Sequence, residues 1–281
     1  MKTLTVKDFR DRKSTGQRLS VLTAYDASMA RLLDNAGADA LLVGDSLGMV
    51  VLGYDSTMPV TMEQMLHHAG AVRRGAQRAL VIGDMPFGSY QISAEQAVRN
   101  GIRFLKEGGC AAVKLEGGAE VCDTVQALVR AGVPVMGHLG LTPQTAGQLG
   151  GFKVQGKDLA AARKLLADAK ALEAVGVFSI VLEAVPAPLA AVITRAVSVP
   201  TIGIGAGPHC DGQVLVTNDM LGLFEKFIPS FVKQYVNLAP EIKKAVQQYI
   251  SEVESGAFPA PEHSVASEEE FSRLLDELSY P

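Results

Sequence analysis

Cysteine is scarce in this sequence. Only three cysteines occur among 281 residues, Cys110, Cys122 and Cys210. Their number is odd and their spacing is unpaired, which argues against a disulfide framework and against a tetrahedral zinc site. We therefore expect a protein of a reducing compartment, the cytoplasm.

Long apolar runs and clusters of one charge are also missing. No uninterrupted apolar run approaches the roughly 18 residues that a membrane span requires. The N-terminal segment is basic, but Asp8 and Asp11 interrupt it and no apolar segment follows, which argues against a cleaved signal. The net charge is -4 and the charges are interspersed, so neither a nucleic-acid surface nor a membrane patch is indicated. A small neutral or anionic metabolite fits better as a partner.

Short apolar runs that end abruptly in an acidic residue recur along the chain. Five of them lead into Asp26, Asp45, Asp84, Glu116 and Glu183. Such runs, alternating with helical segments, are typical of parallel strands that are covered on both faces. We predict strands at residues 20–25, 40–44, 80–84, 111–115, 133–137, 178–182, 200–204 and 213–217.

Eight such units predict a single-domain (β/α)8 TIM barrel, a fold that commonly has about this length. A hydrophobic content of 48% is sufficient for one large core. The rival is a doubly wound open sheet. It would show a ligand fingerprint at one switch point, whereas this sequence distributes acids over many strand ends.

The C-terminal part departs from the barrel pattern. Pro240 and Gly256 frame a predicted helix at 241–255 with apolar residues along one face, which indicates an extra helix that docks by this face. The tail contains a second amphipathic pattern around Phe271 and Leu275, either a short helix packed on the protein's own surface or a partner-binding helix. We expect a barrel catalytic domain at 1–258 and an acidic C-terminal tail at 259–281.

Acidic residues at the strand ends are the candidates for chemistry, because (β/α)8 barrels build their active sites there. Several carboxylates such as Asp45, Asp84 and Glu116 would repel one another unless a cation lay among them. All-oxygen ligation, with neither a cysteine nor a cluster of histidines, favours Mg²⁺ over zinc. Individual acids could instead be helix caps or salt-bridge partners.

Lys114 and His138 are the basic candidates. Lys114 lies two residues before Glu116, so strand alternation points both side chains toward the barrel mouth. The lysine could pair with an acid or bind a substrate carboxylate or oxyanion, whereas nearby acids would keep its amine protonated and disfavour a Schiff base. His138 is either a packed structural histidine that is hydrogen-bonded to the backbone, or a residue of the site that contacts the metal ligands.

Two glycine-bearing segments follow predicted strands. The long loop at 141–157 has a length that is more often found in functional loops than in mere connections. The segment at 202–207 resembles a phosphate loop after the seventh strand, but no lysine follows it as in a P-loop. We favour a tight turn at this segment.

A series of motifs resembles those of the ketopantoate hydroxymethyltransferase family. They run in order from about Thr23 to His263, and only the tail beyond Ser264 extends past the family's usual end. The matching segments are TAYD, LLVGDSLGM, GYDSTMPVT, VKLEGG, GHLGLTPQ, GGFKVQGK, LEAVP, IGIGAG and VESGAFPAPEHS.

The resemblance implies roles for particular residues. The family's metal ligands fall on Asp45, Asp84 and Glu116. Its contacts to the keto acid fall on Asp45, Ser46, Asp84 and Lys114, and its proton acceptor falls on Glu183. The folate-contacting residues are not implied.

The resemblance also implies a reaction and an assembly. A hydroxymethyl group would pass from 5,10-methylenetetrahydrofolate to 3-methyl-2-oxobutanoate through a Mg-stabilised enolate, giving 2-dehydropantoate for pantothenate biosynthesis. Glu183 would take the C3 proton of the keto acid. The family further implies a homo-oligomer, a decamer of two pentamer rings.

Two alternative functions are considered. A barrel of the phosphoenolpyruvate-mutase or isocitrate-lyase type would also bind an α-keto acid or enolate on Mg²⁺, but the sequence offers no cysteine positioned as a general acid after a strand. A non-enzymatic metabolite-binding barrel would bind without turnover. The complete set of base, metal and oxyanion groups argues against it.

Overall fold

The computed structural model describes residues 3–147, 151, 153–265, 271 and 275, and its strands close into one parallel barrel in sequence order. Every neighbouring pair is parallel, and the last strand pairs with the first, Val21 opposite Val214. The strands are β1 (Leu19–Thr23), β2 (Ala40–Val43), β3 (Leu80–Asp84), β4 (Ala112–Glu116), β5 (Val135–Gly140), β6 (Ser179–Glu183), β7 (Thr201–Ile204) and β8 (Gly212–Leu215). The predicted (β/α)8 barrel is confirmed and the open sheet is excluded.

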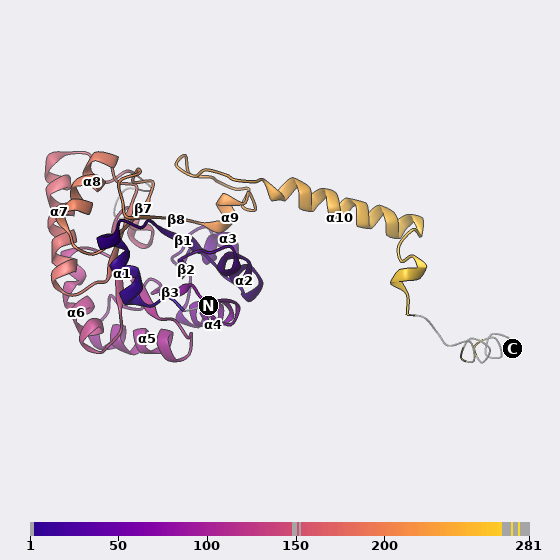
Figure 1. The fold of residues 1–281 in the computed structure, drawn as a ribbon, viewed down its shortest axis with the longest axis horizontal. Coiled ribbons are helices and arrows are strands. Elements are labelled where there is room, and N and C mark those ends of the chain that lie inside the picture. The colour runs from indigo at the N-terminus through magenta and orange to yellow at the C-terminus, as the bar shows by residue number, and fades with distance from the viewer. Residues whose placement is uncertain (1–2, 148–150, 152, 266–270, 272–274, 276–281) are drawn as a thin grey trace.

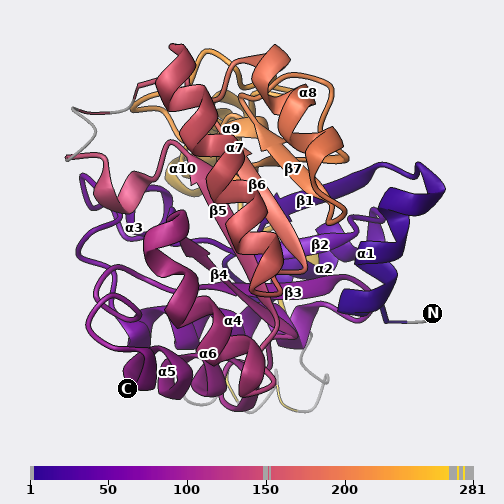
Figure 2. The ribbon, with the colours of Figure 1, turned by 90° about the vertical axis from the view of Figure 1, so that its left-hand side faces the viewer.

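Helices surround the barrel, as Figures 1 and 2 show, and one further helix projects away from it. They are α1 (Val6–Thr15), α2 (Ala27–Asn35), α3 (Leu47–Val50), α4 (Met62–Gly75), α5 (Ala94–Lys106), α6 (Cys122–Arg130), α7 (Leu159–Ala174), α8 (Ala187–Ala196), α9 (Thr217–Met220) and α10 (Leu238–Ser255). Polar caps fix where several begin: Thr61 and Gln64 form a capping box at α4, and Asp158 caps α7.

Strand alternation divides the core into two layers. On β4, Val113 and Leu115 point outward into the layer between strands and helices, whereas Ala112 points into the barrel. Lys114 and Glu116 share the inward face with Ala112. Apolar side chains therefore fill the lower barrel and polar ones line its carboxyl end.

Helix α1 closes the amino-terminal end of the barrel. Phe9 is buried against Phe178, with ring centroids 5.7 Å apart in an edge-on arrangement. Both rings belong to the cluster that fills the barrel interior. With this end plugged, the carboxyl ends of the strands are left to form the site.

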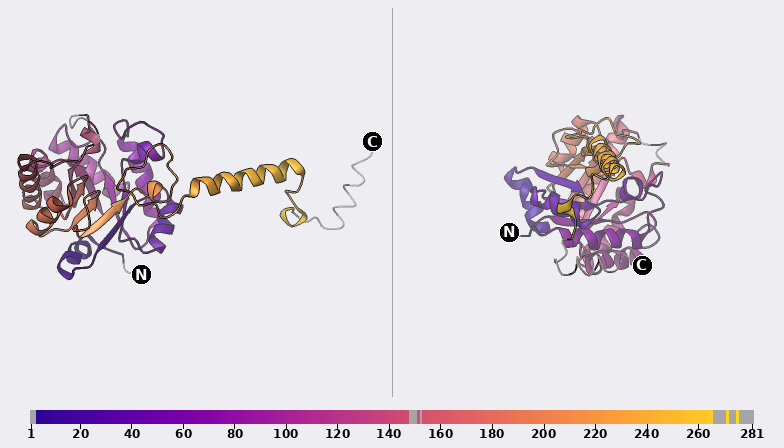
Figure 3. Two further views of the ribbon diagram at one scale, coloured as in Figure 1. Left: turned by 90° about the horizontal axis from the view of Figure 1, so that it is seen from above. Right: turned by 90° about the vertical axis from the view of Figure 1, so that its right-hand side faces the viewer.

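Helix α10 does not dock on the barrel, which corrects the expectation for this segment. It projects away from the body (Figures 1 and 3), and its apolar face is exposed. The face consists of Ile242, Val246, Tyr249, Ile250 and Val253, each between 47% and 54% exposed.

The predicted amphipathic tail helix lies largely outside the described residues, so its two alternatives remain open. The division between a catalytic domain at 1–258 and a tail at 259–281 likewise remains a prediction. Among the residues that the structure describes, no helix combines the length and apolar character needed to cross a membrane.

Candidate active site

A buried ion pair forms the centre of the site. Asp84 at the end of β3 and Lys114 on β4 face each other inside the barrel, and Nζ of Lys114 lies 2.7 and 2.8 Å from the two oxygens of Asp84. Although burial opposes the charge, Asp84 and Glu116 raise the pKa of Lys114 above its ordinary value. Lys114 therefore stays protonated, as the sequence argument against a Schiff base expects.

Glu116 lies beside this pair at the end of β4. Its Oε1 atom is buried and makes no hydrogen bond within the described residues. The nearest cations are Nδ1 of His138 at 3.5 Å and Nζ of Lys114 at 3.9 Å. Buried oxygens of this kind are normally paired, so Oε1 is available to a ligand.

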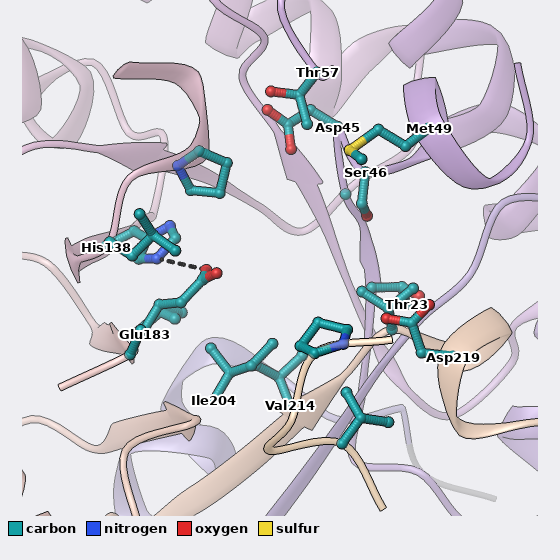
Figure 4. A pocket seen from close by; sticks show the side chains of 18 of the residues that line it. Thr23, Asp45, Ser46, Met49, Thr57, His138, Glu183, Ile204, Val214 and Asp219 are labelled. Carbon is teal, nitrogen blue, oxygen red and sulfur yellow. Dashed lines mark ion pairs between the residues drawn. The ribbon is translucent and has the colours of Figure 1, made fainter. Parts of the chain in front are cut away.

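His138 on β5 connects Glu116 with Glu183. Its Nε2 atom lies 3.2 Å from Oε2 of Glu183, the pair drawn in Figure 4. Burial and Lys114 lower the pKa of His138, but Glu116 and Glu183 outweigh them and raise it to about 9. His138 therefore lies within the site, beside Glu116 and Glu183, and its support of metal ligands stays a prediction.

Asp45 and Ser46 follow β2 and are further polar residues of the site. The backbone N–H of Asp45 donates to Asp84 at 3.3 Å. Burial, together with Asp84 and Glu116, raises the pKa of the Asp45 carboxyl to about 8. Ser46 Oγ lies 2.8 Å from the hydroxyl of Tyr25.

Gln144 is a site residue that the sequence argument did not single out. It stands in the long loop after β5, where its backbone N–H donates to Glu116 at 3.0 Å. Its side-chain amide donates to Asp45 at 2.9 Å, and Tyr90 donates to its carbonyl at 2.8 Å. Gln144 ends the motif GHLGLTPQ, so this motif and the length of the loop were the signals in the sequence that could have indicated a role.

Glu183 stands at the rim, at the end of β6. Its carbonyl accepts from the N–H of Leu141 at 2.8 Å. The following residue, Ala184, has a φ of 48°, a left-handed conformation that costs a non-glycine residue on the order of 1 kcal/mol. The chain turns sharply after Glu183, and the side chain faces His138 (Figure 4).

Asp26 does not lie with the other strand-end acids. The expectation that all five of these acids come together in one site was therefore wrong. Its side chain accepts from the N–H of Met29 at 2.8 Å and caps α2. A strand-end acid that is followed directly by a helix is readily used as a cap. This was the alternative left open for individual acids.

The segment after β7 forms a tight turn, as the sequence argument favoured. Gly205 and Gly207 have φ values of 61° and 78°, which favour glycine. The ring of Phe231 packs against Gly205, where a side chain would come within 2.7 Å of the ring. The turn therefore supports the segment at 221–237 across the barrel mouth.

One cavity of about 340 Å³ lies at the carboxyl ends of the strands, and its lining includes Asp45, Ser46, Asp84, Lys114, Glu116, His138 and Glu183. The buried polar side chains among these residues form the floor of the cavity. Figure 4 shows His138 and Glu183 across the cavity from Asp219 and Thr23. The mouth is lined by Leu141, Pro143, Val154, Phe224, Phe227 and Phe231.

The composition of the site suits a hard divalent cation. Asp45, Asp84 and Glu116 offer only oxygen ligands, and Oε1 of Glu116 is an unpaired acceptor. Within the part of the chain that the structure describes, no three acid, histidine or cysteine side chains already form a metal-binding group. The site therefore suits a divalent cation by its charge and by the type of its ligands. In this structure, both oxygens of Asp84 are bound by Lys114.

The fold and the site together define a (β/α)8-barrel enzyme with its active site at the carboxyl ends of the strands. A family model described as ketopantoate hydroxymethyltransferase matches residues 3–261. The chain belongs to the ketopantoate hydroxymethyltransferase family, and this confirms the resemblance seen in the sequence motifs.

Relatives cover the chain almost completely. A 3-methyl-2-oxobutanoate hydroxymethyltransferase from Desulfotalea psychrophila is 65% identical over 271 residues, 96% of this chain and 97% of its own. One from Heliobacterium modesticaldum is 58% identical over 273 residues, 97% of this chain and 99% of its own. This enzyme is therefore a transferase.

Solved structures share the barrel at low sequence identity. A phosphoenolpyruvate phosphomutase from Streptomyces platensis subsp. rosaceus has a TM-score of 0.61 and 16% identity, with 97% of this chain and 94% of that chain covered. A 2,3-dimethylmalate lyase has a TM-score of 0.58 and 14% identity, with 99% and 100% covered. At this identity the likeness shows the fold alone.

Proposed function

We propose that this enzyme transfers a hydroxymethyl group from 5,10-methylenetetrahydrofolate to 3-methyl-2-oxobutanoate, giving 2-dehydropantoate for pantothenate biosynthesis. The relatives' shared name supports the keto-acid substrate. The observation that carries the proposal is one cavity that joins a protonated lysine, three buried acids and a rim carboxylate. These groups suit proton removal next to a carbonyl.

Binding of the keto acid is assigned to the cavity floor. Lys114 would attract the substrate carboxylate, and Ser46, held by Tyr25, would donate to a substrate oxygen. Asp45, Asp84 and Glu116 are the residues that would hold Mg²⁺. When bound, Mg²⁺ supplies positive charge that stabilises the negative charge developing on the keto oxygen.

Glu183 is assigned the proton transfer. It would accept the C3 proton of the keto acid, and His138, 3.2 Å from its carboxylate, would orient it. C3 then bonds to the methylene carbon of the folate as one of that carbon's two bonds to nitrogen breaks. The second bond to nitrogen breaks as water supplies the hydroxyl oxygen, and the two nitrogens take up the proton from C3, passed on by Glu183, and a proton from the water. Tetrahydrofolate leaves with both nitrogens.

A mutase or lyase activity is the second candidate, because the solved neighbours include such enzymes. No cysteine is among the residues that line the cavity in the described part of the chain, so a cysteine general acid has no support there. The family match favours the transferase instead.

A coupled assay for 2-dehydropantoate tests the proposal. Purified enzyme is incubated with 3-methyl-2-oxobutanoate, with and without 5,10-methylenetetrahydrofolate and with and without a chelator. Product should form only with the folate donor, stop with chelator and return with added Mg²⁺. Absence of product under all conditions would refute the proposed reaction.

We also propose a cytoplasmic homo-oligomer, with the decamer of the family as its size. The exposed apolar face of α10 supports association, because exposed patches of this kind commonly mark interfaces. The three cysteines are free thiols, which fits a reducing compartment.

A further inference from the structure

Asp219 is an acid in the cavity that the reaction described above does not use. It lies on α9, which hydrogen bonds hold against β1: Thr217 donates from its N–H to Thr23 Oγ1 at 2.9 Å and from its hydroxyl to the Thr23 carbonyl at 2.6 Å. Asp219 lines the cavity beside Thr23, away from His138 and Glu183 (Figure 4). Its position is therefore fixed by the fold.

One oxygen of the Asp219 carboxylate is buried without a hydrogen-bond partner. The residue is 7% exposed, and its Oδ1 atom makes no hydrogen bond within the described residues. Its backbone N–H donates to Val216, and its backbone carbonyl accepts from Gly222 and from the side chain of Gln234, so none of these bonds involves the carboxylate. Burial alone raises the pKa of this carboxyl to about 6, so it is mostly ionised at neutral pH. Buried anions are normally hydrogen-bonded to donors, and a ligand in the cavity can supply them here.

The two co-substrates differ in what they can offer to Asp219. The keto acid is an anion, and so is the glutamate end of a folate, and both would be repelled by a carboxylate. The 2-aminopyrimidin-4-one edge of the pterin is uncharged and presents two parallel donors, the N3–H and the 2-amino group. A carboxylate can accept both of these hydrogens at once.

The cavity wall beside Asp219 suits a flat ring. Phe224, Phe227 and Phe231 line the cavity along the segment that follows α9. Phe227 is 64% exposed and Phe231 is 38% exposed, so their rings have uncovered surface available for a ligand. Aromatic side chains bind planar heterocycles by stacking.

We propose that Asp219 binds the pterin of the folate co-substrate through the N3–H and 2-amino group, with the phenylalanine segment 224–231 against the ring. This inference rests on the proposed function, because it assumes a folate donor. The donor edge lies on the opposite ring of the pterin from the nitrogen that carries the methylene group. Holding that edge at Asp219 leaves the methylene carbon free to face the keto acid at Lys114 and Glu183.

The test measures tetrahydrofolate binding by calorimetry, with Mg²⁺ and the keto acid present. Asp219→Asn keeps the shape but replaces one acceptor with a donor that faces the 2-amino group. We expect tetrahydrofolate binding to weaken by about tenfold to a hundredfold, as for loss of a charge-assisted pair. The affinity for the keto acid alone should change by less than about twofold. Asp26→Asn is the matched control, since Asp26 caps α2 outside the cavity.

An analogue of tetrahydrofolate without the 2-amino group tests the same contact from the ligand side, on the wild-type enzyme. The analogue should bind wild type about as weakly as tetrahydrofolate binds Asp219→Asn, and should lose little more on the variant. Equal affinity of wild type for both ligands, or fully additive losses, would overturn the assignment. If wild type binds no tetrahydrofolate, the folate part of the proposed function fails as well. If wild type binds it and Asp219→Asn binds equally, only the role of Asp219 fails.

Discussion

Asp84 contributes both to the stability of the fold and to the proposed binding site. Its carboxylate neutralises Lys114, and removing one partner of a buried ion pair typically costs about 3–5 kcal/mol. We predict that Asp84→Ala lowers the free energy of unfolding and also weakens binding of Mg²⁺ and the keto acid together. Denaturant unfolding and calorimetry measure the two effects.

Asp26→Ala is the matched control for this prediction. Asp26 caps α2 outside the cavity, so its loss should cost about 1 kcal/mol of stability and leave both affinities unchanged. If Asp84→Ala left either affinity intact, the assignment of Asp84 to metal and substrate binding would be wrong.

Asp219 predicts a pH dependence of stability. Its folded pKa, raised to about 6 by burial, exceeds the value of roughly 3.9 in an unfolded chain, so the folded protein binds more protons between these values. The stabilisation of the folded state by proton binding at Asp219 is therefore lost as pH rises from about 4 to 6. Burial raises the pKa of the nearby Tyr25 hydroxyl, so Tyr25 stays neutral over this pH range and does not contribute to the change.

Asp219→Asn should thus raise the midpoint of thermal unfolding of the ligand-free enzyme at pH 7, and the difference from wild type should vanish near pH 4. Calorimetric scans across this range measure it. A variant that is less stable than wild type at pH 7 would show that the carboxylate has a partner.

The residues that could be predicted from the sequence share one property. Asp45, Lys114, Glu116 and Glu183 lie on or directly after strands, and alternation together with barrel closure determines where they point. Gln144 could not be found this way, because its position depends on the path of a loop. Loop paths are set by tertiary contacts rather than by local periodicity.

At the scale of elements, the approach of β5 to β6 positions Glu183. Gly140 has a φ of 95°, and a Cβ there would lie 2.2 Å from the carbonyl oxygen of Glu183. We predict that Gly140→Ala displaces Glu183 and lowers the rate of keto-acid proton exchange by more than about tenfold. Circular dichroism should show that the barrel is retained.

Gly132→Ala is the control for this substitution. Gly132 has a φ of 84° but nothing within 4 Å of a Cβ, so the change introduces backbone strain without a contact at the site. Both variants should lose stability, but only Gly140→Ala should lose exchange. Equal exchange in the two variants would contradict the positioning role of β5.

Strand and helix positions could be read from the sequence more securely than the use of each element. The predicted strands overlap the observed ones because each is a short apolar run between helices. The amphipathic pattern of α10 correctly indicated a helix, but a pattern shows that a face is apolar and not what covers it.

At the scale of the whole molecule, α10 predicts how copies associate. Glutamates in place of Val246 and Ile250 would put charges into its apolar face and should dissociate the proposed homo-oligomer. Light scattering should show a lower mass in solution. Glutamates at Gln248 and Ser251, on the opposite face, should leave the mass unchanged, and an equal mass for both variants would exclude this face as the interface.

The barrel as a whole could be predicted because it depends on the number and order of strands. The assembly could not be derived from composition, because it depends on contacts between chains. Only the family resemblance suggests a decamer, and that size remains a prediction.

The most direct test of the proposed chemistry follows the C3 proton of 3-methyl-2-oxobutanoate in deuterated water by nuclear magnetic resonance. With Mg²⁺, wild-type enzyme should exchange this proton, and chelator should stop the exchange. Glu183→Gln should bind the keto acid with similar affinity but exchange its proton at least about a hundredfold more slowly. Exchange by Glu183→Gln at the wild-type rate, or exchange that persists in chelator, would contradict the account.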